Sequence, residues 1–442
     1  MRTCQVGQSI GVCYDPYQMR TAYQLDGLIA RGYDGAGQTI VIVDAYQHPT
    51  LKAQVETFNT YYGLPPTQLS QVAPDGLTPF DKTDGNMIGW AEEISLDVEW
   101  AHAMAPGAKI VLVLAKTSAD SDILSAINYA VDHHLGNIIS MSFGENETCL
   151  DAATTNGYHQ AFARAARNNI TLLASSGDQG AAQTNCDGTS WTRVVSSPAN
   201  DPLVTAVGGT ELHAADFCLV TLGCTPATAP APGTYKSEIV WNEGPQFGDF
   251  DDVFGSTGAT GGGYSVVFDA PAYQKSVLRG IKQRAVPDVA FNAAVLHGVL
   301  TYLEIPGLPA GYYRFGGTSA GAPQWAAVVA IANEMAGRPL GFLNAALYQI
   351  GRIPPAYGAL FHDVTSGTNS AIEFDVDGNP VTTIGYSAGT GWDATTGLGS
   401  PAPGALAQLL TRYGSASDAD EASNAIIKSG SSLLKPGKVK PH

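Results

Sequence analysis

The run QTIVIVD at residues 38–44 is short, almost continuously apolar and rich in β-branched side chains. That combination predicts a strand buried on both faces, as in a parallel sheet. Similar runs follow at 109–115, 137–143, 170–175 and 204–212, and helical patterns lie between or beside them at 51–61, 91–103, 122–133 and 158–168. Strands that alternate with helices predict an α/β fold, in which a mostly parallel, twisted sheet carries helices on both faces.

The pattern continues without a linker-like interruption to about Gly414, so we expect one domain over residues 1–414. A long apolar helix is predicted at 321–336, directly after a glycine-rich turn. The Gly-, Pro- and Thr-rich segment 223–263 is expected to form surface loops, and residues 415–442, which are small and polar with a basic end, a disordered tail or a truncated linker.

Charge and hydropathy exclude several classes of protein. The chain has 23 basic and 40 acidic residues, a net charge of −17, and no Lys/Arg stripe before the tail, which argues against a nucleic-acid partner. No apolar run reaches the ~18 residues of a membrane span. Charged residues make up only 14% of the chain, against about 25% in ordinary globular proteins, so the surface depends little on ion pairs that acid would remove.

Six cysteines form three neighbouring pairs along the chain: Cys4/Cys13, Cys149/Cys186 and Cys218/Cys224. Six cysteines allow fifteen connectivities, so the pairing rests on proximity alone, and none of the spacings is that of a zinc or redox motif. Three disulfides predict an oxidising compartment outside the cytoplasm. The N-terminus lacks the pattern of a signal peptide, and we therefore expect a secreted protein from which a leader has been removed.

The sequence GTSAGAP at 317–323 places Ser319 on a tight glycine turn directly before the apolar helix. A serine at a helix N-terminus lies beside backbone N–H groups that can hold a developing oxyanion. A serine among glycines is more often only part of a turn. Whether Ser319 is catalytic or structural therefore depends on other motifs in the chain.

Three further segments agree with that motif. G-T-S-x-x-x-P resembles the nucleophile motif of the subtilase superfamily; Ile40–Asp44 resembles its first catalytic strand, Ser140–Gly144 its substrate-binding strand, and Ser175–Asp178 the segment that carries the oxyanion-hole asparagine. The chain departs from subtilases in two ways: no histidine lies in an H-G-T-H-type motif, and Asp178 stands where asparagine is expected.

Both departures are typical of the sedolisins, the serine-carboxyl peptidases, which this chain resembles from about Tyr14 to Tyr413. The family replaces the histidine by a Glu and an Asp four residues apart on one helix, and Glu93 and Asp97 match these positions. The resemblance implies Ser319 as nucleophile, Glu93 as base and Asp97 as its support, with a protonated Asp178 in the oxyanion hole. It also implies Ser142 and Gly144 as substrate-binding residues. Asp44, at the end of its strand, is expected either to be a further acid hydrogen-bonded towards Glu93 or to have a structural role only.

The same resemblance implies one calcium ion, bound by the side chains of Asp363 and Asp393 and by the backbone oxygens of Val364, Gly389 and Gly391. Carboxylate and carbonyl oxygens are the ligands that calcium prefers. A nearby segment, Asp375–Asn379, has the start of an EF-hand loop, but its sixth and twelfth positions are Pro380 and Tyr386 instead of Gly and Glu.

The resulting expectation is a secreted, monomeric, acid-active peptidase, made with its own N-terminal prosegment, that cleaves proteins or peptides at an optimum of roughly pH 3 to 5, because carboxyl groups titrate near pH 4. Endopeptidase and tripeptidyl-peptidase activity both stay open. Two alternatives also remain: an esterase or lipase that uses G-x-S-x-G at 317–321 with His362, and a catalytically silent binding protein of the same fold.

Overall fold

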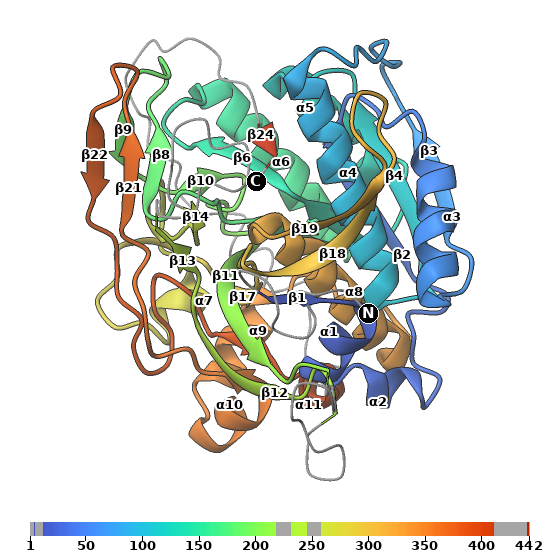
Figure 1. The fold of residues 1–442 in the computed structure, drawn as a ribbon. Helices are drawn as coiled ribbons and strands as arrows, with labels where there is room; N and C mark the ends of the chain where they lie inside the picture. Colours follow the sequence, from blue (N-terminus) through green and yellow to red (C-terminus); the bar gives the residue numbers. More distant parts are fainter. Residues whose placement is uncertain (1–3, 5–11, 218–230, 245–257, 411–439, 442) are drawn as a thin grey trace.

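The computed structural model describes residues 4, 12–217, 231–244, 258–410 and 440–441 of the 442-residue chain (Figure 1). Its main sheet has the strand order β12-β11-β7-β5-β2-β4-β3, and β17 pairs with β11 off this path. Every pairing is parallel except that of β11 with β12. The strands are β2 (Thr39–Ala45), β3 (Gln68–Val72), β4 (Lys109–Ala115), β5 (Ile138–Met141), β7 (Thr171–Ser175), β11 (Thr205–Ala214), β12 (Tyr235–Val240) and β17 (Val289–Asn292).

The predicted mostly parallel sheet is confirmed, with two differences. The run 137–143 is divided at Ser142 into β5 and β6 (Phe143–Asn146), because the chain leaves the sheet there and pairs elsewhere. The expectation of loops over 223–263 is wrong for β12, which extends the sheet, and for the short strands β13 (Asn242–Glu243) and β14 (Gly258–Ala259). Residues 223–230 and 245–257 lie outside the described residues, as does the expected tail at 415–442 except for the short strand at 440–441.

Helices cover both faces of the sheet, as the alternation of side chains along β2 requires. Ile40 and Ile42 belong to the core on the side of α3 (Leu51–Tyr62), α4 (Gly85–Met104) and α8 (Thr318–Ala336). Val41 and Val43 point the other way, to the core that includes α5 (Asp120–Asp132) and α6 (Ala152–Arg167). The buried helices α4 and α8 therefore pack against each other and against the same face of the sheet.

Around this centre, β1 (Val12–Tyr14), β18 (His297–Leu303) and β19 (Gly311–Phe315) form a separate three-stranded sheet. Two of the predicted disulfides are confirmed, Cys4–Cys13 and Cys149–Cys186; Cys218 and Cys224 lie outside the described residues. The other helices are α1 (Pro16–Ala22), α2 (Asp26–Ile29), α7 (Ala272–Lys275), α9 (Asn344–Gly351), α10 (Pro354–Leu360) and α11 (Pro403–Leu410), and the other strands are β8 (Ala182–Thr184), β9 (Trp191–Arg193), β10 (Ser196–Ser197), β15 (Gly263–Asp269), β16 (Gln283–Val286), β20 (Phe361–His362), β21 (Ala371–Phe374), β22 (Pro380–Thr383), β23 (Ser400–Pro401) and β24 (Lys440–Pro441).

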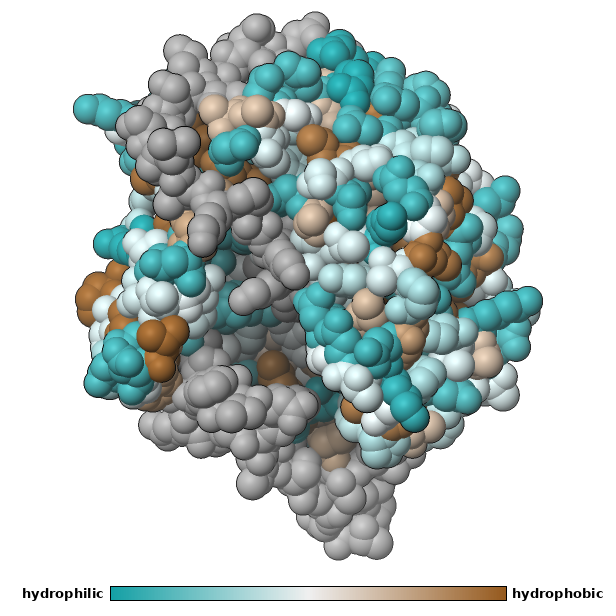
Figure 2. Space-filling model, turned by 90° about the horizontal axis from the view of Figure 1, so that it is seen from above, coloured by the Kyte–Doolittle hydropathy of each residue, from teal (hydrophilic) through white to brown (hydrophobic). Residues whose placement is uncertain are grey.

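The surface shown in Figure 2 is mainly polar, with hydrophobic residues in small separate areas among hydrophilic ones. Within the described ranges, no helix combines the length and the hydropathy that crossing a bilayer requires.

Candidate active site

Ser319 lies in the first turn of α8, after a turn that only glycine can form. Gly317 has a φ of 86°, in the left-handed region, and a Cβ on Gly316 would lie 2.5 Å from the carbonyl oxygen of Ala293. The Gly317 N–H donates to that same carbonyl over 2.7 Å. These two glycines therefore hold the serine at the helix N-terminus, where backbone N–H groups have no partner within the helix.

Pro323 lies four residues after Ser319 in the same helix. Because proline has no N–H, it cannot make the helical hydrogen bond to the carbonyl of Ser319. The hydroxyl of Ser142 approaches this carbonyl instead, at 3.5 Å. The proline of the nucleophile motif thus leaves the serine's own carbonyl open to a side chain from the neighbouring strand.

The two carboxyl groups predicted on one helix face do meet the serine. Glu93 and Asp97 lie one turn apart on α4, with 5% and 0% of their surface exposed. The hydroxyl of Ser319 hydrogen-bonds to Glu93, and the carboxyl groups of Glu93 and Asp97 hydrogen-bond to each other. Asp97 also accepts a 2.8 Å hydrogen bond from Ser142. A line of hydrogen bonds therefore runs from the candidate nucleophile to Glu93, Asp97 and Ser142.

Asp44, at the end of β2, is the third acid of this cluster. It is fully buried, and among the described residues neither of its carboxyl oxygens has a hydrogen-bond partner, so the expected hydrogen bond to Glu93 is not formed. Burial raises its pKa to about 8. Burial also raises the pKa values of Glu93 and Asp97 well above their usual range; the nearby acids, Asp44 among them, raise both further, and the bonds from Ser319 and Ser142 lower them. The cluster consequently retains protons at pH values at which an exposed carboxyl group is ionised.

Asp178 approaches the serine from another side, in the turn after β7. Its Oδ1 accepts hydrogen bonds from the backbone N–H and the hydroxyl of Thr318, at 2.7 and 2.8 Å. Oδ2 takes no part in either bond. Burial raises the pKa of Asp178 to about 6, although both bonds from Thr318 lower it. Below that pH, Oδ2 can carry a proton and act as a hydrogen-bond donor beside the start of α8.

Sequence reasoning missed Thr318 as part of this site. The residue lies beside the predicted nucleophile, but a threonine in a turn carries no signal of its own. In the structure its hydroxyl also accepts from the N–H of Gly177 at 3.1 Å, so it ties the Asp178 turn to the Ser319 turn.

The two residues predicted to bind substrate lie at the division between β5 and β6. The side chain of Ser142 is directed to Asp97, so only its backbone is open to a substrate. Gly144 lies in β6, which pairs on one side with β10 and elsewhere with β24, where Lys440 is opposite Gly144 and Pro441 opposite Phe143 (Figure 1). β24 also contacts α4. An extended piece of chain can therefore lie antiparallel along the predicted substrate strand.

The predicted calcium ligands follow the nucleophile helix in the sequence, and their two carboxylates come close together. Both carboxylates lie close enough to the hydroxyl of Tyr357 to raise its pKa. Asp363 accepts hydrogen bonds from Tyr357 and from the N–H of Gly391, and Asp393 accepts one from the N–H of Gly389. Among the described residues, no hydrogen bond is donated to the carbonyls of Val364, Gly389 or Gly391. Two carboxylates beside unused carbonyl oxygens fit an oxygen-seeking cation.

His362, the histidine that an esterase would need, is occupied elsewhere. It lies in β20, and its ring stacks on Tyr235 with the ring centres 3.9 Å apart. The hydroxyl of Ser319 bonds to Glu93. The structure therefore offers Ser319 a carboxyl group as its proton acceptor.

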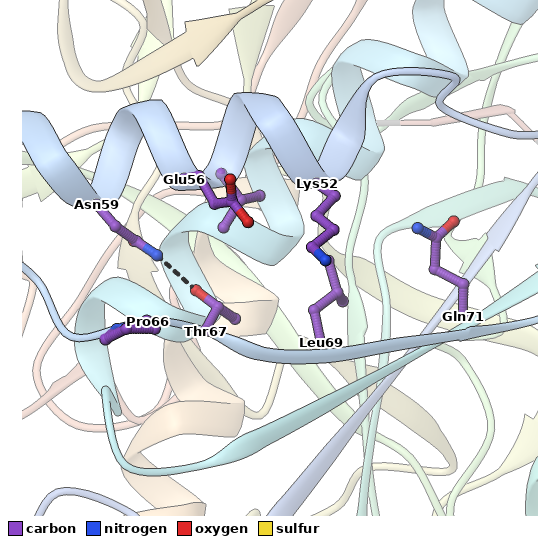
Figure 3. A pocket seen from close by; sticks show the side chains of 8 residues that line it. Lys52, Glu56, Asn59, Pro66, Thr67, Leu69 and Gln71 are labelled. Carbon is purple, nitrogen blue, oxygen red and sulfur yellow. Dashed lines mark hydrogen bonds between the residues drawn. The ribbon is translucent and has the colours of Figure 1, made fainter.

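A small pocket of about 180 Å³ lies between α3 and β3. Figure 3 shows Lys52, Glu56 and Asn59 on the helix facing Thr67 and Leu69 on the strand side, with Asn59 bonded to Thr67. None of the predicted site residues lines this pocket.

Comparison with known proteins gives consistent matches. The model of the subtilase family matches residues 85–340. Kumamolisin from Bacillus sp. (strain MN-32) is 35% identical over 416 residues, which are 90% of this chain and 63% of that protein. Sedolisin from Pseudomonas sp. (strain 101) is 33% identical, and the match covers 70% of this chain and 47% of that protein. Human tripeptidyl-peptidase 1 is 30% identical, and the match covers 62% of this chain and 43% of that protein.

Among solved structures, Pseudomonas sedolisin, a serine-carboxyl proteinase complexed with two molecules of pseudo-iodotyrostatin, superposes with a TM-score of 0.72 at 30% identity. The match covers 90% of this chain and 98% of that one. The curated relatives are longer: the chain spans 63% of kumamolisin and about half or less of the other two.

Proposed function

The chain belongs to the sedolisin family of serine-carboxyl peptidases, within the subtilases, and on that premise we propose that it hydrolyses peptide bonds in acid through an acyl-enzyme on Ser319. The observation that carries the proposal is the hydrogen bond from the Ser319 hydroxyl to the buried carboxyl group of Glu93, inside the contact between α4 and α8. A serine paired with a base and placed at a helix N-terminus has the arrangement that nucleophilic catalysis requires.

In the first half of the reaction, Oγ of Ser319 attacks the peptide carbonyl while its proton passes to Glu93. The C–N bond then breaks, and Glu93 returns the proton to the leaving amine. Water hydrolyses the resulting ester by the same steps, with Glu93 again taking and giving one proton. Loss of one proton from the cluster of Glu93, Asp97 and Asp44 leaves a single negative charge, which the hydroxyls of Ser319 and Ser142 stabilise by hydrogen bonds.

The oxyanion of the tetrahedral intermediate is held by Oδ2 of protonated Asp178 and by the backbone N–H of Ser319. The bonds from Thr318 fix Oδ1 of Asp178, which leaves Oδ2 as the position for the proton. An ionised Asp178 would repel the developing charge instead. Activity in this scheme therefore requires a pH below the pKa of Asp178, which burial raises to about 6.

An extended peptide substrate is proposed to bind along β6, next to Ser142 and Gly144. The pairing of Lys440–Pro441 with this strand supports the proposal, since it shows that the backbone of β6 accepts an antiparallel segment. The disulfides Cys4–Cys13 and Cys149–Cys186 support secretion into an oxidising compartment. A monomeric enzyme released from its own prosegment completes the proposal.

A peptide library incubated with the protein from pH 2 to 8 tests this function. We expect cleavage that is greatest in acid and no comparable hydrolysis of a short-chain ester. The positions of the cuts distinguish cleavage within chains from removal of tripeptides from the N-terminus. Ester hydrolysis without peptide cleavage would favour the esterase, and the absence of both would favour a silent binding protein.

We also propose that one calcium ion is held by Asp363, Asp393 and the carbonyls of Val364, Gly389 and Gly391. Its contribution is structural: it joins the turn after β20 to the turn before β23. Removing calcium with a chelator is expected to lower the melting temperature by about 3 to 5 °C, the size expected when a ligand at 100 times its Kd is withdrawn. Scanning calorimetry in the Ser319→Ala background excludes self-digestion from the measurement.

The variant Asp393→Ala separates the metal from the side chain's other bonds, since Asp393 also accepts from Thr395 and Thr396. Its own melting temperature falls, so the informative quantity is the further shift on chelation, which should vanish. Asp377→Ala, in the exposed loop that starts like an EF-hand, is the control and should keep the full shift. With the protein first freed of metal and reloaded with calcium alone, equal chelator shifts in both variants would show that calcium binds elsewhere.

A further inference from the structure

Two side chains near the end of β11 point in the same direction. Glu211 and His213 are two residues apart on this strand, so both lie on one face of it. The pairing of β11 with β12 changes register between His213 and Ala214. A third side chain, that of His297, comes from the start of β18, where its backbone lies opposite Val12 of β1.

The three side chains meet within the span of a metal site. Oε1 of Glu211 lies 3.1 Å from Nε2 of His213 and 3.1 Å from Nδ1 of His297, and the ligand atoms of all three residues lie within 4.8 Å of one another. Two ligands bound to zinc at 2.0 to 2.1 Å in a tetrahedron are about 3.3 Å apart. The two observed separations are therefore those of atoms that share one such ion.

Among the described residues, one of these atoms has no hydrogen-bond partner. Nδ1 of His297 is buried, and its approach to Glu211 lacks the geometry of a hydrogen bond. A buried ring nitrogen with no donor or acceptor is costly unless something else satisfies it.

The surrounding charges are mixed. Lys236 and Arg314 lie close enough to lower the pKa values of His213 and His297, respectively. On the other side, Glu238 raises the pKa of His213 and Glu243 is within electrostatic range of Glu211. Glu211 and these two further carboxyl groups offset part of the positive charge that a cation at the centre of the three ligands would add.

From this geometry we propose that Glu211, His213 and His297 bind one divalent cation of the zinc class, with water at the remaining position. Imidazole nitrogen together with a single carboxylate selects zinc and its late first-row neighbours, whereas calcium and magnesium prefer oxygen alone. The site is separate in residues and in chemistry from the one proposed for calcium.

The position of the site suggests what it stabilises. Thr210, next to Glu211, accepts hydrogen bonds from the N–H groups of Ala293 and Ala294, and the carbonyl of Ala293 accepts from Gly317. Gly317 begins the turn that carries Ser319. An ion that joins β11 to β18 would therefore stabilise the position of Thr210 and, through Ala293, that of the glycine turn before Ser319.

The test is a titration of the full-length protein with zinc chloride near pH 7, after dialysis against a chelator and in excess calcium chloride. Isothermal titration calorimetry should show one equivalent bound in the micromolar range or tighter, with a rise in melting temperature. In His297→Ala and Glu211→Gln, affinity should fall at least tenfold. Far-ultraviolet circular dichroism checks that the variants are folded, and Glu211→Gln preserves the size of the side chain.

His133→Ala is the matched control, because His133 is an exposed histidine at the end of α5 whose ring nitrogen bonds only within its own helix. It should bind zinc as the unchanged protein does. The proposal is overturned if the unchanged protein takes up no zinc saturably, or if His297→Ala and Glu211→Gln bind it as tightly. These outcomes do not depend on peptidase activity, so they stand whether or not the proposed function is correct.

Discussion

Replacing Ser319 by alanine is expected to lower kcat for peptide hydrolysis at pH 4 by about 10⁴-fold or more. The variant loses the atom that forms the acyl-enzyme, and what remains is the smaller effect of binding and of the oxyanion donors. Initial rates on a chromogenic peptide measure this directly. Because Ser319 is fully buried against α4, calorimetry should accompany the assay to show that the fold is retained.

Ser95→Ala is the control for this experiment. Ser95 lies on α4 between the two acids, but its hydroxyl donates to the Ala91 carbonyl of its own helix, so kcat should change by less than about threefold. Glu93→Gln should lose nearly as much activity as Ser319→Ala, and the double variant little more, since residues that act as one unit are not additive. Full hydrolysis by the Ser319→Ala protein would remove the serine from the mechanism.

Replacing Asp178 by asparagine is expected to move the alkaline limit of activity upward. In the unchanged protein, the pKa of about 6 means that Asp178 is protonated and able to donate below pH 6, and that activity falls about tenfold per pH unit above it. Asparagine keeps an oxygen for the two bonds from Thr318 and supplies an N–H donor at every pH. The profile of kcat/KM against pH should therefore extend into the neutral range.

Asp178→Ala distinguishes the donor from the charge. This variant has neither the hydrogen-bond donor nor the ionisable group of Asp178. We therefore expect kcat to fall by about 10²- to 10³-fold over the whole pH range, as when one oxyanion donor is lost. The proposed role of Asp178 fails if the asparagine variant keeps the alkaline limit of the unchanged protein. The acidic limit should stay in place in both variants, because it belongs to the cluster of Glu93, Asp97 and Asp44.

The sheet could be predicted because its strands are buried on both faces and therefore read as apolar runs. β4 was located to the residue at both ends. Edge strands were harder: β3 and β12 each have several exposed positions and so lack that signal. α4 begins at Gly85, six residues before the predicted start, because it is capped by Asp84 and its first five residues include two glycines, which no apolar periodicity marks.

In the candidate site, too, the sequence predicted contacts within one element but not contacts between elements. Glu93 and Asp97 share a helix turn, so their proximity follows from spacing, and the resemblance to a family supplied their relation to Ser319. The hydrogen bond from Ser142 to Asp97 joins the end of a strand to a helix, and the sequence does not show how these two elements are placed against each other. His297 meets Glu211 and His213 where β18 contacts β11, two strands that are far apart in the sequence, so metal-ligand spacing in the sequence does not reveal the cluster.

The buried acids on α4 and β2 link folding to the uptake of protons. Their pKa values are raised in the folded chain, to about 8 for Asp44, whereas in the unfolded chain they titrate near pH 4. Between those values the folded form holds more protons, so the free energy of unfolding decreases as the pH rises. At neutral pH the fold is therefore weakened by the same carboxyl groups that we propose to serve it in acid, so its stability depends on the acidity around it.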